Sequence, residues 1–200
     1  MSTIQHRLGP ADHGRAISIQ EFREAEEEEG YRYELARGVL EVTEAPGPAH
    51  RRIVGNLYRA IARYDQDHPG LIETFGGGSE FRLWIPGKES GRNPDLGVVL
   101  EGSSRDARGR TQPALVAEVV SRGSRVRDYQ AKREEYHQFG IREYWIVDPT
   151  LRRVVVLDRS QADWNERVVN ADDVIPSLVL PGLHTRVSEL WAGVTPDDDA

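Results

Sequence analysis

The strongest constraint on the fold comes from residues 114–120, a run that is apolar at every position except Glu118. A strand that is apolar on both faces is typical of the centre of a sheet that helices cover on both sides. Burying an ionised carboxylate there without a partner is unfavourable, so Glu118 must be neutralised, paired with a cation or bound to a metal. A structural ion pair, for instance with an arginine of the following helix, and a functional site are both open on this pattern alone.

Helix and strand patterns alternate along the rest of the chain. Apolar spacing and capping signals predict helices over residues 17–29, 50–67 and 125–139. Short apolar runs predict strands over residues 31–35, 39–42, 71–75, 80–84, 95–100, 114–120, 144–147 and 154–157, with weaker signals near Val168 and Val179. This order predicts a mixed α/β domain in which helices flank a sheet. We expect a mobile N-terminal arm over residues 1–16, a single domain over 17–191 and an acidic tail over 192–200.

The composition is that of a globular protein, with 38% hydrophobic and 30% charged residues among 200. This is too apolar for a disordered chain, and no run approaches the ~18 apolar residues that a membrane span requires. The N-terminus lacks the apolar core and the small-residue cleavage site of a signal peptide. Because the chain has no cysteine, disulfides and thiolate metal sites are excluded. We therefore expect a cytoplasmic protein that does not contact a membrane.

The charge is unevenly distributed along the chain. A formal net charge of −7 argues mildly against a dedicated nucleic-acid-binding protein, because basic side chains usually neutralise the phosphates. The acidic excess lies in residues 26–29 and 197–199. Residues 122–133 are instead basic, because their only acid is Asp128. Their basic side chains are Arg122, Arg125, Arg127, Lys132 and Arg133. This basic segment fits either a phosphate path or a solvated helix face.

A second acid and a lysine raise the weight of a functional site. Asp95 opens another apolar strand, and two adjacent strands that carry one acid each can place two oxygens on one cation, as Mg²⁺ prefers. Asp128, Lys132 and Tyr136 are spaced four residues apart and so share one helix face. An ammonium on that face can stabilise negative charge that develops at a phosphorus. The alternative for Lys132 is an exposed helix lysine paired with Asp128.

Several motifs together resemble a known family. They are Asn93-Pro94-Asp95, the run 116–121, the spacing Asp128-x3-Lys132-x3-Tyr136, the string Gly140-Ile-Arg-Glu-Tyr-Trp-Ile-Val-Asp-Pro149, and residues 33–41. Over about residues 17–190 the chain resembles the Uma-two family of putative restriction endonucleases, which belongs to the PD-(D/E)XK nuclease superfamily. The resemblance implies a restriction-endonuclease-like mixed sheet flanked by helices, in a single nuclease-like domain over residues 17–191.

The resemblance also implies roles for individual residues. Asp95 and Glu118 would be the metal carboxylates, with Glu34 as an additional acid. The superfamily lysine normally follows the second acid by two residues, where this chain has Val120, so Lys132 from the next helix would replace it. The chain departs from the usual Ser-Pro-Ser of the family at Ser121-Arg122-Gly123. Weaker candidates for nucleic-acid contacts, each with a surface, capping or core role as the alternative, are His50, Arg122, Arg125, Arg127 and Tyr136.

The expected function is Mg²⁺-dependent endonucleolytic hydrolysis of DNA, with Mn²⁺ able to substitute. Asp95 and Glu118, helped by Glu34, would hold the metal, and Lys132 would position the attacking water. A homodimer would supply one active site for each DNA strand. The main alternative is a catalytically inactive nuclease fold that binds nucleic acid or protein, which the net charge favours. An acid–base pair acting on a glycoside fits poorly, because it leaves the third carboxylate and the lysine without a role.

Overall fold

The computed structural model describes residues 7–105, 109–160 and 162–195. Within these ranges the chain divides into two compact units. Unit 1 comprises Met1–Pro46 and Ser79–Asn93, and unit 2 comprises Gly47–Gly78 and Pro94–Ala200. The residues expected to form a single domain over 17–191 are thus shared between the two units. The expected acidic tail over 192–200 lies largely outside the described residues.

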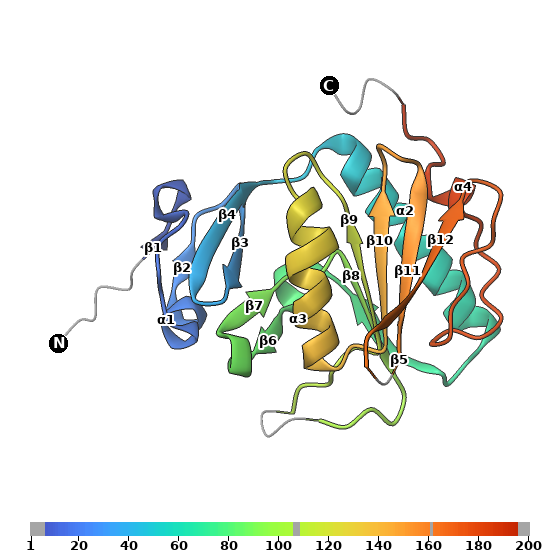
Figure 1. Cartoon of the computed structure of the whole chain (residues 1–200), viewed down its shortest axis with the longest axis horizontal. Coiled ribbons are helices and arrows are strands. Elements are labelled where there is room, and N and C mark those ends of the chain that lie inside the picture. The colour runs from blue at the N-terminus through green and yellow to red at the C-terminus, as the bar shows by residue number, and fades with distance from the viewer. Residues whose placement is uncertain (1–6, 106–108, 161, 196–200) are drawn as a thin grey trace. The chain divides into compact units, whose positions relative to one another are not determined.

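Unit 2 is built on a mixed sheet that, among the described residues, has six strands in the order β12-β11-β10-β9-β8-β5 (Figure 1). The strands are β5 (Ile72–Gly76), β8 (Leu96–Leu100), β9 (Leu115–Val119), β10 (Glu143–Asp148), β11 (Arg153–Arg159) and β12 (Trp164–Asn170). The neighbours β9 and β10 run parallel, and the other pairs are antiparallel. The apolar run with Glu118 is therefore a central strand, as its pattern predicts.

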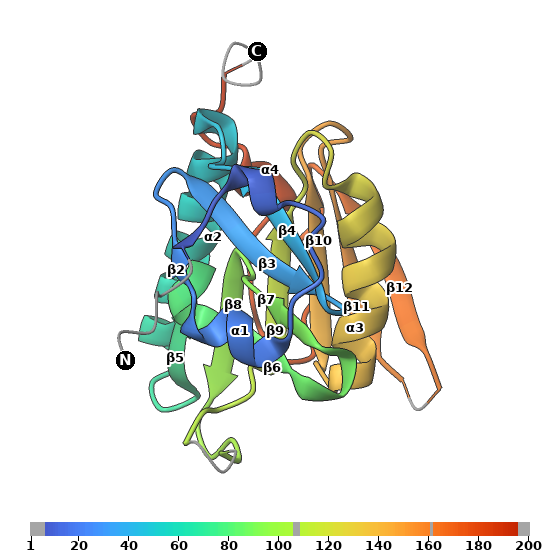
Figure 2. The same cartoon turned by 90° about the vertical axis from the view of Figure 1, so that its left-hand side faces the viewer.

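Helices cover both faces of this sheet. Figures 1 and 2 show α2 (Pro48–Asp67) and α3 (Lys132–Phe139) on opposite faces, which explains why every residue of β9 is buried. Apolar side chains of α2, such as Ile53 and Leu57, pack into a core with Ala117 and with the C-terminal segment that includes α4 (Val187–Leu190). In the described part of the chain, no helix is both long and apolar enough to cross a membrane.

The segment before α3 departs from a regular α-helix. Residues Arg127–Ala131 form a π-helical turn that continues directly into α3, and Gly140, at φ 95°, ends the helix in the left-handed conformation. The predicted helix over 125–139 is present, but its first part is wound more widely. A π-turn inserts an extra residue into a helix and often lies at a functional site.

Unit 1 contains a sheet with the order β4-β3-β7-β6 over its described strands. They are β3 (Tyr31–Ala36), β4 (Val39–Glu44), β6 (Leu83–Ile85) and β7 (Ser90–Arg92), beside the helix α1 (Ile19–Glu24). The β3–β4 hairpin turns at Arg37 and Gly38, which both have positive φ. Ser18 and Glu21 form a capping box at the start of α1. The core of this unit contains Leu8, Phe22, Tyr33, Leu35 and Leu40.

Several predicted boundaries are wrong. Helix α1 ends at Glu24 instead of residue 29, because Glu26–Glu27 form a short strand, β2, parallel to β1 (Arg7–Leu8). Leu8 is buried, so the prediction of a mobile arm is wrong for residues 7–16; residues 1–6 lie outside the described ranges. The predicted strand over 80–84 begins as a 3-10 turn at Gly78–Phe81. No strand forms at Val179 in the described structure.

Candidate active site

Glu118 lies on β9, and its side chain meets α3. Its Oε1 accepts hydrogen bonds from Lys132 Nζ at 2.9 Å and from the Tyr136 hydroxyl at 2.6 Å. All three side chains are buried. The buried acid of the central strand is therefore paired with a lysine of the following helix, and the alternative of an exposed Lys132 does not describe this structure.

Asp95 lies beside Glu118 in the sheet. The antiparallel register sets Leu96 of β8 opposite Ala117 of β9, so Asp95, the residue that directly precedes β8, lies next to Glu118 of β9. Asp95 is 2% exposed, and its Oδ2 accepts a hydrogen bond from the backbone N–H of Val119 at 2.8 Å. The same oxygen lies 3.0 Å from His50 Nε2, at the start of α2. Asp95 is thereby held from both its neighbouring strand and a helix.

Asp128 is a third buried carboxyl group at this site. Its Oδ2 accepts a hydrogen bond from the Ser124 hydroxyl at 2.5 Å, and its Oδ1 lies 3.9 Å from Lys132 Nζ. Burial raises the pKa of Asp128 above its usual value, and the negative charge of Asp95 raises it further, whereas Lys132 and the Ser124 hydrogen bond lower it. Glu118 and Asp128 thus both lie beside the Lys132 ammonium.

The sequence predicts Asp128 only as a partner for Lys132 on a helix face. The spacing Ser124-x3-Asp128-x3-Lys132 was the available signal for a buried chain of polar contacts. It could not be distinguished from a solvated helix face, because the π-turn and the burial of this face are set by packing on the sheet.

Glu34 belongs to unit 1, whereas Asp95, Glu118 and Lys132 belong to unit 2. On β3, Glu34 lies with its Oε2 3.3 Å from Arg92 Nη1, and its Oε1 accepts a hydrogen bond from the backbone N–H of Asn93 at 2.8 Å. Arg92 is fully buried and also contacts Glu41, at 2.6 Å. Within unit 1, Glu34 is therefore part of a buried ion-pair cluster.

The basic segment is largely engaged by acids of unit 2. Arg125 pairs with Asp148 at 2.7 Å, and Arg133 pairs with Glu166 at 2.6 Å. Arg122 is exposed and Arg127 is half-buried. The other candidates for nucleic-acid contacts, His50 and Tyr136, are buried against Asp95 and Glu118.

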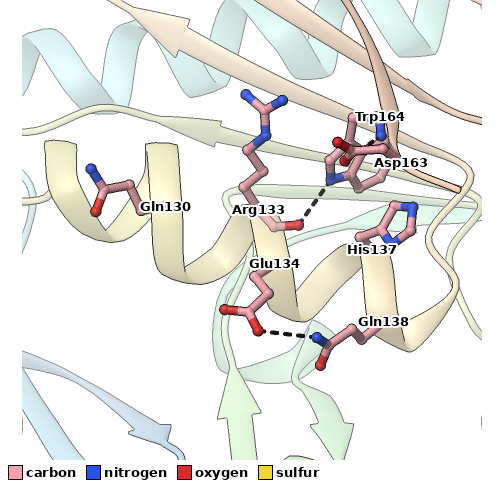
Figure 3. Close-up of a pocket in the computed structure, with 7 residues that line it drawn as sticks. All are labelled: Gln130, Arg133, Glu134, His137, Gln138, Asp163 and Trp164. Carbon is pink, nitrogen blue, oxygen red and sulfur yellow. Dashed lines mark hydrogen bonds between the residues drawn. The ribbon is translucent and has the colours of Figure 1, made fainter.

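A shallow hollow of about 190 Å³ lies elsewhere on α3 (Figure 3). Side chains of α3 line it together with Asp163 and Trp164, whose indole N–H donates to the carbonyl oxygen of Arg133 at 2.9 Å. Neither Asp95 nor Glu118 lines this hollow, so it is separate from the carboxylate site.

The carboxylate site has a donor set that suits a hard cation. Over the described residues, no group of three or more His, Cys, Asp or Glu side chains is arranged to hold a metal ion. Mg²⁺ is commonly bound through only one or two carboxylates, with waters and substrate phosphate completing its shell. Asp95 and Glu118, as adjacent buried carboxylates, fit that requirement.

Comparison with known proteins agrees with this architecture. The chain is similar to a crystal structure from Anabaena variabilis described as a putative nuclease belonging to DUF820, with 19% identity and a TM-score of 0.68 over 88% of this chain and 98% of that chain. This similarity confirms the predicted fold class. Proteins of curated function gave no match. Residues 19–188 match the family model Uma2, described as putative restriction endonuclease, and the chain therefore belongs to that family.

Proposed function

We propose that this protein is a Mg²⁺-dependent endonuclease that hydrolyses DNA phosphodiester bonds. Its active site would consist of Asp95, Glu118 and Lys132. The observation that carries the proposal is the geometry of these three buried side chains. Asp95 directly precedes β8, Glu118 lies next to it in register on the adjacent strand β9, and an ammonium lies 2.9 Å from Glu118. Membership of a putative restriction endonuclease family supports the same reaction class.

The residues around the two carboxylates would orient them for a metal. The Val119 N–H and His50 hold Asp95, while Tyr136 and Lys132 hold Glu118. Hydrogen bonds of this kind fix the direction of ligand side chains and tune the affinity of a metal site. When bound there, Mg²⁺ would polarise the scissile phosphate and lower the pKa of the attacking water.

The chain's own cations would act on the phosphate. Lys132 would stabilise the negative charge that develops in the transition state, because its buried ammonium acts in a surrounding of low dielectric constant. The exposed Arg122, next to the strand that carries Glu118, would contact the DNA backbone. A homodimer is the arrangement that would cut both strands.

Plasmid cleavage with Mg²⁺ or Mn²⁺ tests this proposal. We expect the wild type to nick or linearise DNA, and Asp95→Asn, Glu118→Gln and Lys132→Gln each to reduce the rate roughly 100-fold or more. Asp158→Asn is the matched control. It also changes a buried carboxylate to an amide, but Asp158 bonds to Asn165 and Arg167 and should leave cleavage unchanged. Equal activity in all four variants and the wild type would refute the assignment.

A second candidate is a nuclease fold that binds nucleic acid or protein without cutting. It is favoured by the net charge of −7 and by the direct pairing of Lys132 with Glu118, which neutralises both groups without a metal. This candidate predicts salt-sensitive binding without cleavage. It also predicts no change in melting temperature with Mg²⁺, whereas specific metal binding to the folded state must raise that temperature.

A further inference from the structure

Asp128 is a buried carboxylate that the proposed hydrolysis does not use. It is 2% exposed, and the Ser124 hydroxyl, itself buried, donates to its Oδ2 at 2.5 Å. Ser124 is held in turn, because its Oγ accepts a hydrogen bond from the backbone N–H of Ser121 at 2.8 Å. These contacts orient the Asp128 carboxyl group with its other oxygen, Oδ1, on the side of Lys132.

Lys132 lies between two carboxylates at unequal distances. Its Nζ is 2.9 Å from Glu118 Oε1, a direct hydrogen bond, and 3.9 Å from Asp128 Oδ1, which is too far for a hydrogen bond. The two distances differ by about 1 Å, so rotation of the flexible lysine side chain is enough to exchange one partner for the other.

We propose that Asp128 is a second partner for Lys132: when Glu118 takes a divalent cation, the Lys132 ammonium leaves Glu118 and pairs with Asp128. This inference rests on the proposed function, since it takes Glu118 to be a metal ligand. A cation on Glu118 repels the neighbouring ammonium, and a buried ammonium without a partner is strongly unfavourable. Asp128 is thus a positioning residue, which keeps Lys132 charged and beside the site through the change.

A double-mutant cycle on Mn²⁺ affinity tests this role. We expect Asp128→Asn to weaken Mn²⁺ binding roughly 10- to 100-fold in titration calorimetry, as removal of a group that supports metal ligands does. In a Lys132→Gln background Asp128 has no ammonium to pair with, so Asp128→Asn should have no further effect on Mn²⁺ affinity. Ser124→Ala removes the donor to Asp128 Oδ2 and should weaken binding in the same direction by a smaller factor. Asp158→Asn should bind Mn²⁺ as the wild type does.

The side-chain nitrogen of Lys132 offers a readout that does not depend on activity. Its ¹⁵N resonance, assigned by its loss in Lys132→Gln, should shift when Mg²⁺ is added to the wild type. In Asp128→Asn the bound-state shift should differ, because the carboxylate partner is gone.

The outcomes separate this inference from the proposed function. If the wild type binds no Mn²⁺, the metal site itself is wrong and the exchange of partners is overturned with it. If the wild type binds Mn²⁺ but Asp128→Asn binds it equally well, only the role of Asp128 is overturned. The same holds if the effect of Asp128→Asn persists undiminished in the Lys132→Gln background, since Asp128 would then act without Lys132.

Discussion

Replacing Tyr136 with phenylalanine removes one hydroxyl from the carboxylate site and keeps the ring. The hydroxyl donates to Glu118 Oε1 at 2.6 Å, and the side chain is wholly buried, so its loss leaves a carboxylate oxygen with one donor fewer. The ring packs edge-on against Tyr144, with 5.0 Å between the ring centroids, and phenylalanine retains that contact. The variant therefore reports mainly on the hydrogen bond.

The decrease in the free energy of unfolding caused by Tyr136→Phe depends on the charge of Glu118. A hydrogen bond to a charged group contributes about 1.5–3 kcal/mol to the free energy of unfolding, and one between neutral groups about 1 kcal/mol. Because Lys132 Nζ lies 2.9 Å from the same oxygen, we expect Glu118 to be ionised and the larger loss to apply. For a chain of about 200 residues this corresponds to a fall in melting temperature of roughly 3–12 °C.

Tyr64→Phe is the matched control for this measurement. Tyr64 is also buried, on α2, and its hydroxyl donates to the neutral carbonyl oxygen of Pro181 at 2.9 Å. Urea unfolding followed by tryptophan fluorescence at neutral pH compares the two variants. If Tyr136→Phe loses no more stability than Tyr64→Phe, Glu118 is not a charged acceptor, and the argument from its ionisation to a metal site is refuted.

Three further predictions concern single positions. A Cβ at Gly77 would collide with the backbone carbonyl of Asp95, so Gly77→Ala should lower both the melting temperature and the nuclease activity. The control is Gly55→Ala inside α2, which should raise the free energy of unfolding by about 1 kcal/mol. Equal effects of the two substitutions on stability would contradict the predicted collision at Gly77. Burial raises the pKa of Asp128, so the folded wild type holds that proton more tightly than the unfolded chain and loses stability as pH rises through the folded pKa. Asp128→Asn lacks this loss, and thermal melts from about pH 4 to about pH 7 should show its stability rising relative to the wild type, whereas a constant difference would exclude the raised pKa. Arg92→Met leaves two carboxylates of a buried cluster without their cation and should cost about 3–5 kcal/mol in urea unfolding; a loss under about 1 kcal/mol would show that the cluster is not buried as described.

Elements with a long apolar pattern were predictable from the sequence, and short ones were not. A continuous run of apolar residues predicts the central strand β9, and apolar residues along one face predict helix α2. Strand β7 is three residues, Ser-Gly-Arg, with no such pattern, and it exists because it pairs with β3 and β6. Similarly, the parallel pairing of β1 with β2 ends α1 early, and no local signal at residues 26–27 indicates it.

The candidate site was likewise predictable only in part from the sequence. The sequence by itself determined that Glu118 lies on a buried strand, that Asp95 lies at the beginning of another apolar run and that Lys132 follows on a helix, because the apolar pattern of each segment indicates which residues are buried. Only the tertiary structure decided their partners. His50 is 45 residues from Asp95 along the chain, and Tyr136 is 18 from Glu118.

Such partners depend on strand register and on how each helix packs on the sheet. The register sets Asp95 beside Glu118, and the seating of α3 brings Lys132 to Glu118. Asp128 joins them through the π-turn, a feature of packing that helical spacing does not predict. A carboxylate inside an apolar strand therefore shows from sequence that a partner must exist, while which side chain fills that place is decided by contacts between segments distant in the chain.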